Sequence, residues 1–136
     1  MKCYLNVVSI QKILFSEYIK KIHITTINGI LNIYPGHTAL LTTTIPGALY
    51  ILTKFNKKKY IYISSGILEV QPMFIQVVVK KAIFAEHLNY DTLMKKKNSI
   101  NMLMKDSQLN KKKELYHSLK KINAKLYTIN IMKQCV

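Results

Sequence analysis

The sequence predicts an all-β sandwich followed by a C-terminal antiparallel hairpin of two helices. Short apolar runs fill residues 3–84, and turn residues separate them about every 8–12 positions, as is typical of sandwiches and barrels. After Glu86 the apolar residues recur at a helical period instead of alternating. We therefore expect two domains, a β-sandwich over residues 1–85 and a helical hairpin over residues 86–136.

Alternation and turn chemistry predict the individual strands. Residues 22–25 alternate, which places Ile22 and Ile24 inward and His23 and Thr25 outward. The Asn28-Gly29 pair is a strong hairpin signal. Further strands are expected over residues 4–9, 30–33, 39–41, 48–53, 60–63, 67–70 and 74–79.

Proline and glycine predict where these strands are connected. In Tyr34-Pro35-Gly36-His37, Pro35 fixes its own φ and Gly36 accepts a positive φ. This segment is interpreted as a turn that leaves His37 at the start of the next strand, at an end of the β-structure. Pro46-Gly47 predicts a second turn, and the polar residues 54–59 predict a hairpin tip.

Two helices are expected after the sandwich. Asn89 is a candidate N-cap, and Asp91 suits the positive end of the helix dipole. The first helix has an apolar face, interrupted by Lys97, that consists of Tyr90, Leu93, Ile100, Leu103 and Met104. The polar residues 106–110 break the pattern. A heptad-like seam follows, formed by Leu115, Leu119, Ile122, Leu126 and Ile129. Each helix is near the length at which isolated helices are marginal, so we expect the hairpin to pack on the sandwich or on another subunit.

The composition is strongly basic, with a net charge of +15, yet all 21 basic residues are lysine. A protein selected for contacts with phosphates or base edges would be expected to retain arginine for bidentate hydrogen bonds. Isoleucine, asparagine, tyrosine and lysine are enriched together, which favours a bias of the coding sequence toward A and T. Docking on an acidic protein surface is a further interpretation of the lysine-rich helices.

The sequence contains no pattern that indicates catalysis, a cofactor or a metal. The histidines His23, His37, His87 and His117 lack ligand spacing, and no glycine-rich phosphate loop or Gly-x-Ser-x-Gly elbow is present. The carboxylates are scattered and never paired. Cys3 and Cys135 are expected to be free thiols. No run of about 18 apolar residues occurs, so no direct insertion into a membrane is expected.

One stretch leaves an alternative function open. Tyrosines beside lysines in Lys57-Lys58-Lys59-Tyr60-Ile61-Tyr62 could form a stacking platform for RNA or single-stranded DNA. The competing interpretation is a solvated hairpin tip, and we favour it. Under the alternative, the chain would be a small basic β-domain with a helical tail that binds nucleic acid.

Three blocks of the chain resemble the epsilon subunit of F-type ATP synthases. The first is Gly29-Ile-Leu-Asn-Ile-Tyr-Pro-Gly-His-Thr-Ala-Leu-Leu41, and the second is Ile63-Ser-Ser-Gly-Ile-Leu-Glu-Val-Gln-Pro72. The third comprises Leu5 to Ser9 followed by Phe15-Ser16. The blocks keep the relative spacing of the family, and together they cover essentially the whole chain.

The resemblance implies a fold, a location and partners. The fold would be a sandwich of about ten strands in two sheets, followed by the helical hairpin. The chain would be a non-catalytic subunit of the central stalk, peripheral at the cytoplasmic face of the bacterial inner membrane. It would bind the gamma subunit and the c-subunit ring, and its helices would reach the catalytic beta subunits and the alpha subunits and regulate ATP hydrolysis.

The resemblance also assigns residues to these contacts. Those expected to lie at one end of the sandwich and to contact gamma and the c ring are Asn28, Gly29, Ile30, Leu31, Tyr34, Pro35, Gly36 and His37. Where relatives commonly have an acidic residue, this chain has Ile30, which offers only apolar contact. The seam from Leu115 to Ile129 would be the regulatory part of the hairpin.

Some relatives bind ATP through Ile/Leu-Asp-x-x-Arg-Ala at the start of the first helix. The matching positions here run from Leu88 to Leu93, and only Leu88 fits. Asn89 replaces the aspartate, Thr92 replaces the arginine and Leu93 is bulkier than the alanine. Losing the arginine removes a charge and a bidentate fork. We therefore expect no specific ATP site.

Overall fold

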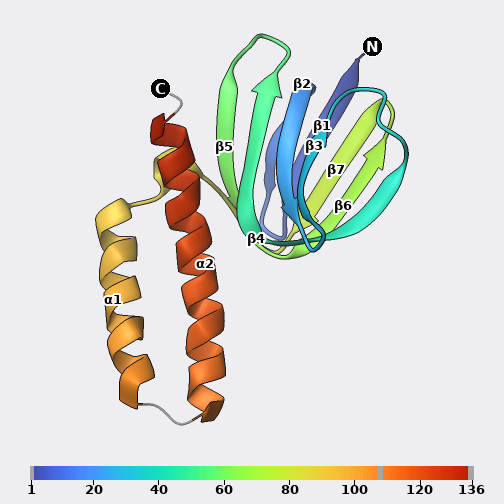
Figure 1. The fold of residues 1–136 in the computed structure, drawn as a ribbon. Helices are drawn as coiled ribbons and strands as arrows, with labels where there is room; N and C mark the ends of the chain where they lie inside the picture. Colours follow the sequence, from blue (N-terminus) through green and yellow to red (C-terminus); the bar gives the residue numbers. More distant parts are fainter. Residues whose placement is uncertain (1, 107–108, 135–136) are drawn as a thin grey trace.

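The computed structural model describes residues 2–106 and 109–134, and it consists of a β-sandwich with a helical hairpin beside it (Figure 1). The strands are β1 (Cys3–Ser9), β2 (Ile13–Thr26), β3 (Gly29–Ile33), β4 (Leu40–Thr53), β5 (Lys58–Ile63), β6 (Gly66–Gln71), β7 (Phe74–Val79) and β8 (Ala82–Phe84). A 3-10 turn, η1 (Ala85–His87), leads into α1 (Tyr90–Asp106) and α2 (Leu109–Gln134).

The strands form one continuous sheet that folds back on itself. Their order is β3-β2-β1-β7-β6-β4-β5-β8, and β2 also pairs with β4. The pairing of β1 with β7 is parallel, whereas the other pairings are antiparallel. The β2–β4 pairing closes a ring through β2, β1, β7, β6 and β4, and the apolar core lies inside it.

The described residues contain eight strands, fewer than the family resemblance implied, because β2 and β4 are each 14 residues long and serve both layers. Residues 40–44 of β4 pair with β6, and residues 47–52 pair with β5. The turn predicted at Pro46-Gly47 is therefore wrong, since both residues lie within β4 where its partners change. Proline has no N–H to donate at this bend. A Cβ at Gly47 would lie 2.6 Å from Thr25 Cβ, so the close approach of β2 requires glycine.

The other connections occur close to their predicted positions. The β2–β3 hairpin turns at Ile27 and Asn28, and Gly29 begins β3 with a φ of +105°. In the next connection Gly36 has a φ of +90°, and the His37 N–H donates to the Tyr34 carbonyl at 3.1 Å, which confirms a turn. His37 precedes the next strand instead of starting it, because β4 begins only at Leu40.

The sandwich core consists of alternate strand residues whose side chains point inward. Ile22 and Ile24 are fully buried, as predicted, and His23 and Thr25 face outward. Buried with them are Cys3, Leu5, Val7, Phe15, Ile19, Ile33, Leu49, Ile51, Ile61, Ile63, Leu68, Val70, Ile75, Val77, Val79 and Ala82. Burial raises the pKa of the Cys3 thiol, and Cys3 is a free cysteine. Cys135 lies outside the described residues.

The two helices form an antiparallel hairpin in which α2 lies next to the sandwich and α1 lies outside it (Figure 1). The cap is confirmed, because the Thr92 N–H donates to Asn89 Oδ1 at 3.1 Å. The predicted polar break is shorter than residues 106–110, since α1 extends to Asp106 and α2 begins at Leu109. Within the described residues, no helix is both long and apolar enough to span a bilayer.

Candidate interaction surfaces

The predicted partner-contact residues lie at two places in the structure. Residues 28–31 occupy the β2–β3 turn and the start of β3, whereas residues 34–37 follow the end of that strand. The Ile27 N–H donates to Thr43, near the Gly66 end of β6, and the Gly36 N–H donates to Pro72, beyond the opposite end of β6. The expectation that both segments lie at one end of the sandwich is therefore wrong, because β3 separates them.

The exposure of these residues differs along the segment. Asn28, Gly29, Tyr34 and Gly36 are exposed. Ile30 is 61% exposed, which agrees with its expected availability for apolar contact. Leu31, in contrast, packs against the sandwich core. Pro35 and His37 are partly buried, and the His37 ring is hydrogen-bonded through Nδ1 to the Thr38 carbonyl at 2.7 Å.

A second surface is an exposed apolar row on the outer face of β2, β1, β7 and β6, here called the outer stripe. The register aligns Ile13 with Val8, Val8 with Val78, and Val78 with Ile67. Ile13 is 63% exposed, Ile67 54% and Val78 45%. The sequence signal that we missed is the apolar residues Ile13, Ile67 and Val78 at outward-facing strand positions, where alternation predicts polar side chains.

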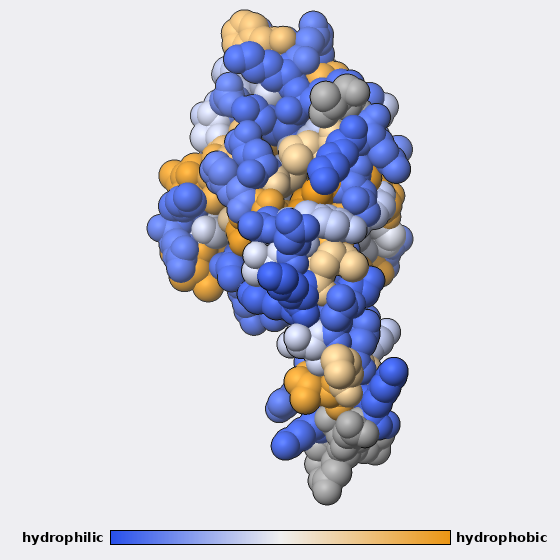
Figure 2. All heavy atoms as spheres, turned by 90° about the vertical axis from the view of Figure 1, so that its left-hand side faces the viewer, coloured by the Kyte–Doolittle hydropathy of each residue, from blue (hydrophilic) through white to orange (hydrophobic). Residues whose placement is uncertain are grey.

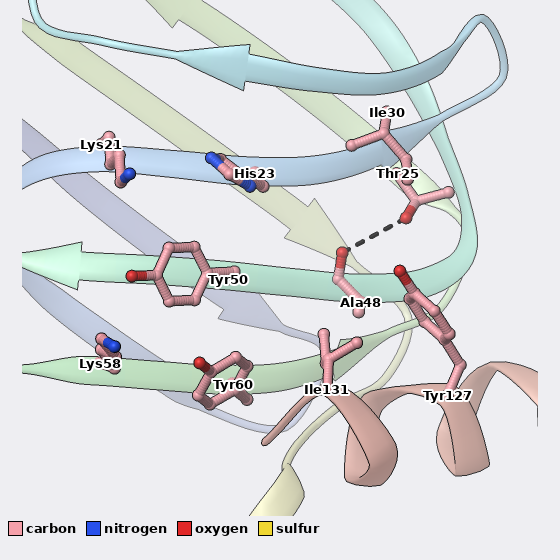
Figure 3. Close-up of a pocket in the computed structure, with 10 residues that line it drawn as sticks. All are labelled: Lys21, His23, Thr25, Ile30, Ala48, Tyr50, Lys58, Tyr60, Tyr127 and Ile131. Carbon is pink, nitrogen blue, oxygen red and sulfur yellow. Dashed lines mark hydrogen bonds between the residues drawn. The ribbon is translucent and has the colours of Figure 1, made fainter. Parts of the chain in front are cut away.

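A third surface is a groove of about 350 Å³ between α2 and the outer face of β2, β4 and β5, here called the helix–sheet groove. Figure 3 shows its lining, which consists of Lys21, His23, Thr25, Ile30, Ala48, Tyr50, Lys58, Tyr60, Tyr127 and Ile131. Sequence reasoning missed this groove, because it exists only once β2 pairs with β4 and α2 docks beside them.

Strand register builds the floor of this groove. His23 pairs with Tyr50 and Tyr50 pairs with Tyr60, and the ring centroids are 5.2 Å apart in both contacts. Two residues further along the strands, on the same face, Lys21 and Lys58 flank Leu52. Burial and the nearby Lys21 charge both lower the pKa of His23, which favours the neutral imidazole.

The predicted helix seam is buried only in its C-terminal half. Ile122, Leu126 and Ile129 form a second apolar core with Leu93 of α1. Leu115 and Leu119 are only partly buried. On the first helix, Tyr90 and Leu103 are exposed, because the part of α1 that meets this core presents Leu93, Met94 and Ile100 instead.

Four lysines converge where the hairpin meets the sandwich. Lys125 of α2 holds its Nζ 5.2 Å from the ring centroid of Tyr62, which is almost fully buried. The pKa of Lys125 is lowered by burial and by the charges of Lys81, Lys96 and Lys121. This junction, here called the lysine junction, places like charges on the sandwich, on α1 and on α2.

The stacking platform considered for nucleic acid is not available. Tyr60 is 9% exposed and Tyr62 is 1% exposed, so neither ring is exposed enough for bases to stack on it. The two tyrosines are covered because α2 packs on this face of β5. No group of three metal-ligating side chains is close enough to hold an ion within residues 2–106 and 109–134.

Comparison with known proteins gives agreement at the levels of sequence and fold. Residues 2–85 match a family model described as the beta-sandwich domain of the ATP synthase delta/epsilon chain. The fold is similar to a chain of the Euglena gracilis mitochondrial ATP synthase, in a structure of OSCP, F1 and the c-ring, with a TM-score of 0.83 at 18% identity. That match covers 90% of this chain and 78% of the other.

A second similar fold comes from the central stalk and c-ring of the Tetrahymena thermophila mitochondrial ATP synthase. Its TM-score is 0.68 at 15% identity, and the match covers 95% of this chain and 97% of the other. Both matches extend beyond the sandwich into the hairpin, so the likeness of fold includes the helices.

Proposed function

Because the chain belongs to the delta/epsilon family of ATP synthase chains, we propose that it is a non-catalytic subunit of the central stalk that links the gamma subunit to the c ring. The proposed location is peripheral, at the cytoplasmic face of the bacterial inner membrane. The helical hairpin regulates ATP hydrolysis by leaving the sandwich to contact the alpha and beta subunits.

The observation that supports this proposal best is the outer stripe. Its side chains come from four adjacent strands, so it is a continuous apolar row and not a set of isolated residues. Continuous exposed apolar surfaces mark protein contact sites. We assign this face to the gamma subunit, together with the Tyr34–His37 connection. The β2–β3 turn, with Ile27 and Ile30 both more than half exposed, is assigned to the c ring.

The distribution of burial along the hairpin supports a regulatory role. Only the C-terminal half of the α2 seam is buried, whereas Met102 and Leu103 on α1 and Tyr116 on α2 are at least half exposed. In Figure 1 the connected ends of the helices extend past the sandwich. A hairpin held at one end detaches at lower cost than one packed along its whole length.

The test is binding of gamma by variants of the outer stripe. Ile67→Asp and Val78→Asp each place a charge within the stripe, and we expect each to weaken capture by gamma at least tenfold, because a charge would be buried unpaired in the interface. The matched control is Phe55→Asp, which changes a residue that is 74% exposed at the β4–β5 tip. Equal capture of all three variants would contradict the assignment of this face.

A further inference from the structure

The helix–sheet groove has different chemistry at its two ends. Figure 3 shows Lys21 and Lys58 at one end, and the phenol oxygens of Tyr50 and Tyr60 point toward that end. Ile30, Ala48, Tyr127 and Ile131 lie toward the other end. The aromatic row of His23, Tyr50 and Tyr60 forms the floor between them. The groove therefore changes from basic to apolar along its length.

The positive charges at one end of the groove favour a ligand with an anionic head group. The two lysines stand on either side of Leu52 in one register row, and no carboxylate is among the residues that line the groove. His23 adds no competing positive charge to the floor when it is neutral, because its pKa is lowered. A carboxylate or phosphate between the lysines would gain two charge-assisted hydrogen bonds.

The volume limits the size of the ligand. The groove offers about 350 Å³, which is within the range of small-molecule sites. Each carbon of an unbranched chain takes up about 30 Å³, roughly the volume of one water molecule in the liquid. A chain of about ten carbons therefore fits this space.

We propose that the helix–sheet groove binds a single-chain amphiphilic anion, with its acidic head between Lys21 and Lys58 and its apolar body against Ala48, Tyr127 and Ile131. The site lies apart from the outer stripe, and it shares only Ile30 with the surface assigned to the c ring. Tyr127 and Ile131 belong to α2, and the other lining residues belong to the sandwich. A bound ligand therefore connects the two parts and stabilises the docked hairpin by linkage.

The first experiment varies the head group at a constant tail. Decanoate, decyl phosphate, decan-1-ol and decyltrimethylammonium are titrated into the full-length chain below the concentrations at which they form micelles. We expect saturable one-to-one binding of the two anions, at least tenfold weaker binding of the alcohol and weaker binding still of the cation. The ratio between decanoate and decyl phosphate distinguishes a fatty acid from a phosphate ester as the preferred class. Equal affinity for all four probes, or no saturation by either anion, would overturn the proposal.

The second experiment separates this site from non-specific attraction to a basic protein. Lys21→Gln combined with Lys58→Gln should weaken decanoate binding at least tenfold and leave decan-1-ol unaffected. Lys57→Gln combined with Lys112→Gln removes the same charge from exposed positions outside the groove and should leave both affinities unchanged. If both double variants weaken decanoate binding equally, the anion is attracted by the overall positive charge of the protein and the assigned site is wrong.

The third experiment locates the apolar end and the effect on the hairpin. Ile131→Ala should weaken all the probes that bind, whereas Ile67→Asp in the outer stripe should weaken none. Decanoate should also slow amide hydrogen exchange in the C-terminal half of α2. Binding that survives Ile131→Ala but is lost in Ile67→Asp would place the ligand on the outer stripe and would contradict the proposal.

Discussion

At the scale of single residues, Gly66 is a position where the sandwich leaves no room for a side chain. A Cβ there would lie 2.1 Å from the Val78 carbonyl oxygen and 2.6 Å from Val79 Cα, both backbone atoms of the neighbouring strand. We predict that Gly66→Ala lowers the free energy of unfolding by more than about 3 kcal/mol, since β6 and β7 must separate locally. Urea unfolding measures this change.

Gly29→Ala is the matched comparison, because its only cost is conformational. No atom lies within 4 Å of the added Cβ, but φ is +105°. We expect a loss of about 1–2 kcal/mol for an L side chain with positive φ. If Gly66→Ala cost no more than Gly29→Ala, the close approach of β6 and β7 would not be the reason for glycine at position 66.

The prediction that the chain has no specific ATP site rests on Asn89 and Thr92. The Asn89 side chain accepts the Thr92 N–H at 3.1 Å, so it caps α1, and Leu93 is buried in the second core. We predict no specific ATP binding in isothermal titration of the isolated chain at physiological salt. A saturable one-to-one site of millimolar or tighter affinity, abolished by substitution of Asn89 or Asp91, would contradict this prediction.

At the scale of the elements, the lysine junction opposes the docking of α2. The pKa of Lys125 is lowered in the folded state, so the charged form is destabilised relative to the unfolded chain. This penalty is fully present at neutral pH and disappears as pH rises from the folded pKa to the ordinary value of 10.5. We predict that Lys125→Met raises Tm by a few degrees at pH 7, although it removes the contact with Tyr62.

Salt provides the control for this prediction. High salt screens the repulsion among the four lysines, so the gain in Tm from Lys125→Met should shrink between about 0.05 M and 1 M salt. Lys112→Met, an exposed substitution elsewhere on α2, should leave Tm almost unchanged at both concentrations. A gain that is independent of salt would show that repulsion among the lysines is not responsible, and would leave burial of the Lys125 charge or apolar packing as the cause.

Local patterns predicted the strands and the cap because their determinants are local. The alternation of Ile22 to Thr25 assigns inward and outward faces, and Asn89 carries its own acceptor for an N-terminal N–H. Pro46-Gly47 was misassigned because its role depends on tertiary structure. The same dipeptide that favours a turn also allows a long strand to change partners, and the close approach of Thr25 is visible only after β2 pairs with β4.

The candidate surfaces were harder to predict than the fold. Apolar residues at outward positions of β6 and β7, Ile67 and Val78, carried a signal for the outer stripe, although which strands lie beside them depends on the register. The helix–sheet groove combines residues from β2, β3, β4, β5 and α2, and no local pattern relates them. The family signature around Gly29 identified the segment, but the length of β3 separates its two halves.

At the scale of the whole molecule, we predict that residues 1–85 fold without the hairpin and still bind gamma. The sandwich has its own core, and the outer stripe lies on strands that α2 does not contact extensively. Loss of α2 uncovers Ala48, Tyr60 and Tyr62, so stability should fall without loss of the fold. Circular dichroism of the truncated chain is the measurement, and an unfolded spectrum would show that the hairpin is part of the core.

The central claim is that this chain belongs to the central stalk of an ATP synthase, and affinity purification of the tagged full-length chain from gently solubilised membranes tests it most directly. We predict that the gamma and c subunits co-purify in constant proportion with the alpha and beta subunits, and that nuclease treatment changes nothing. Recovery without any of these subunits, or with nucleic acid whose removal disperses the complex, would contradict the account.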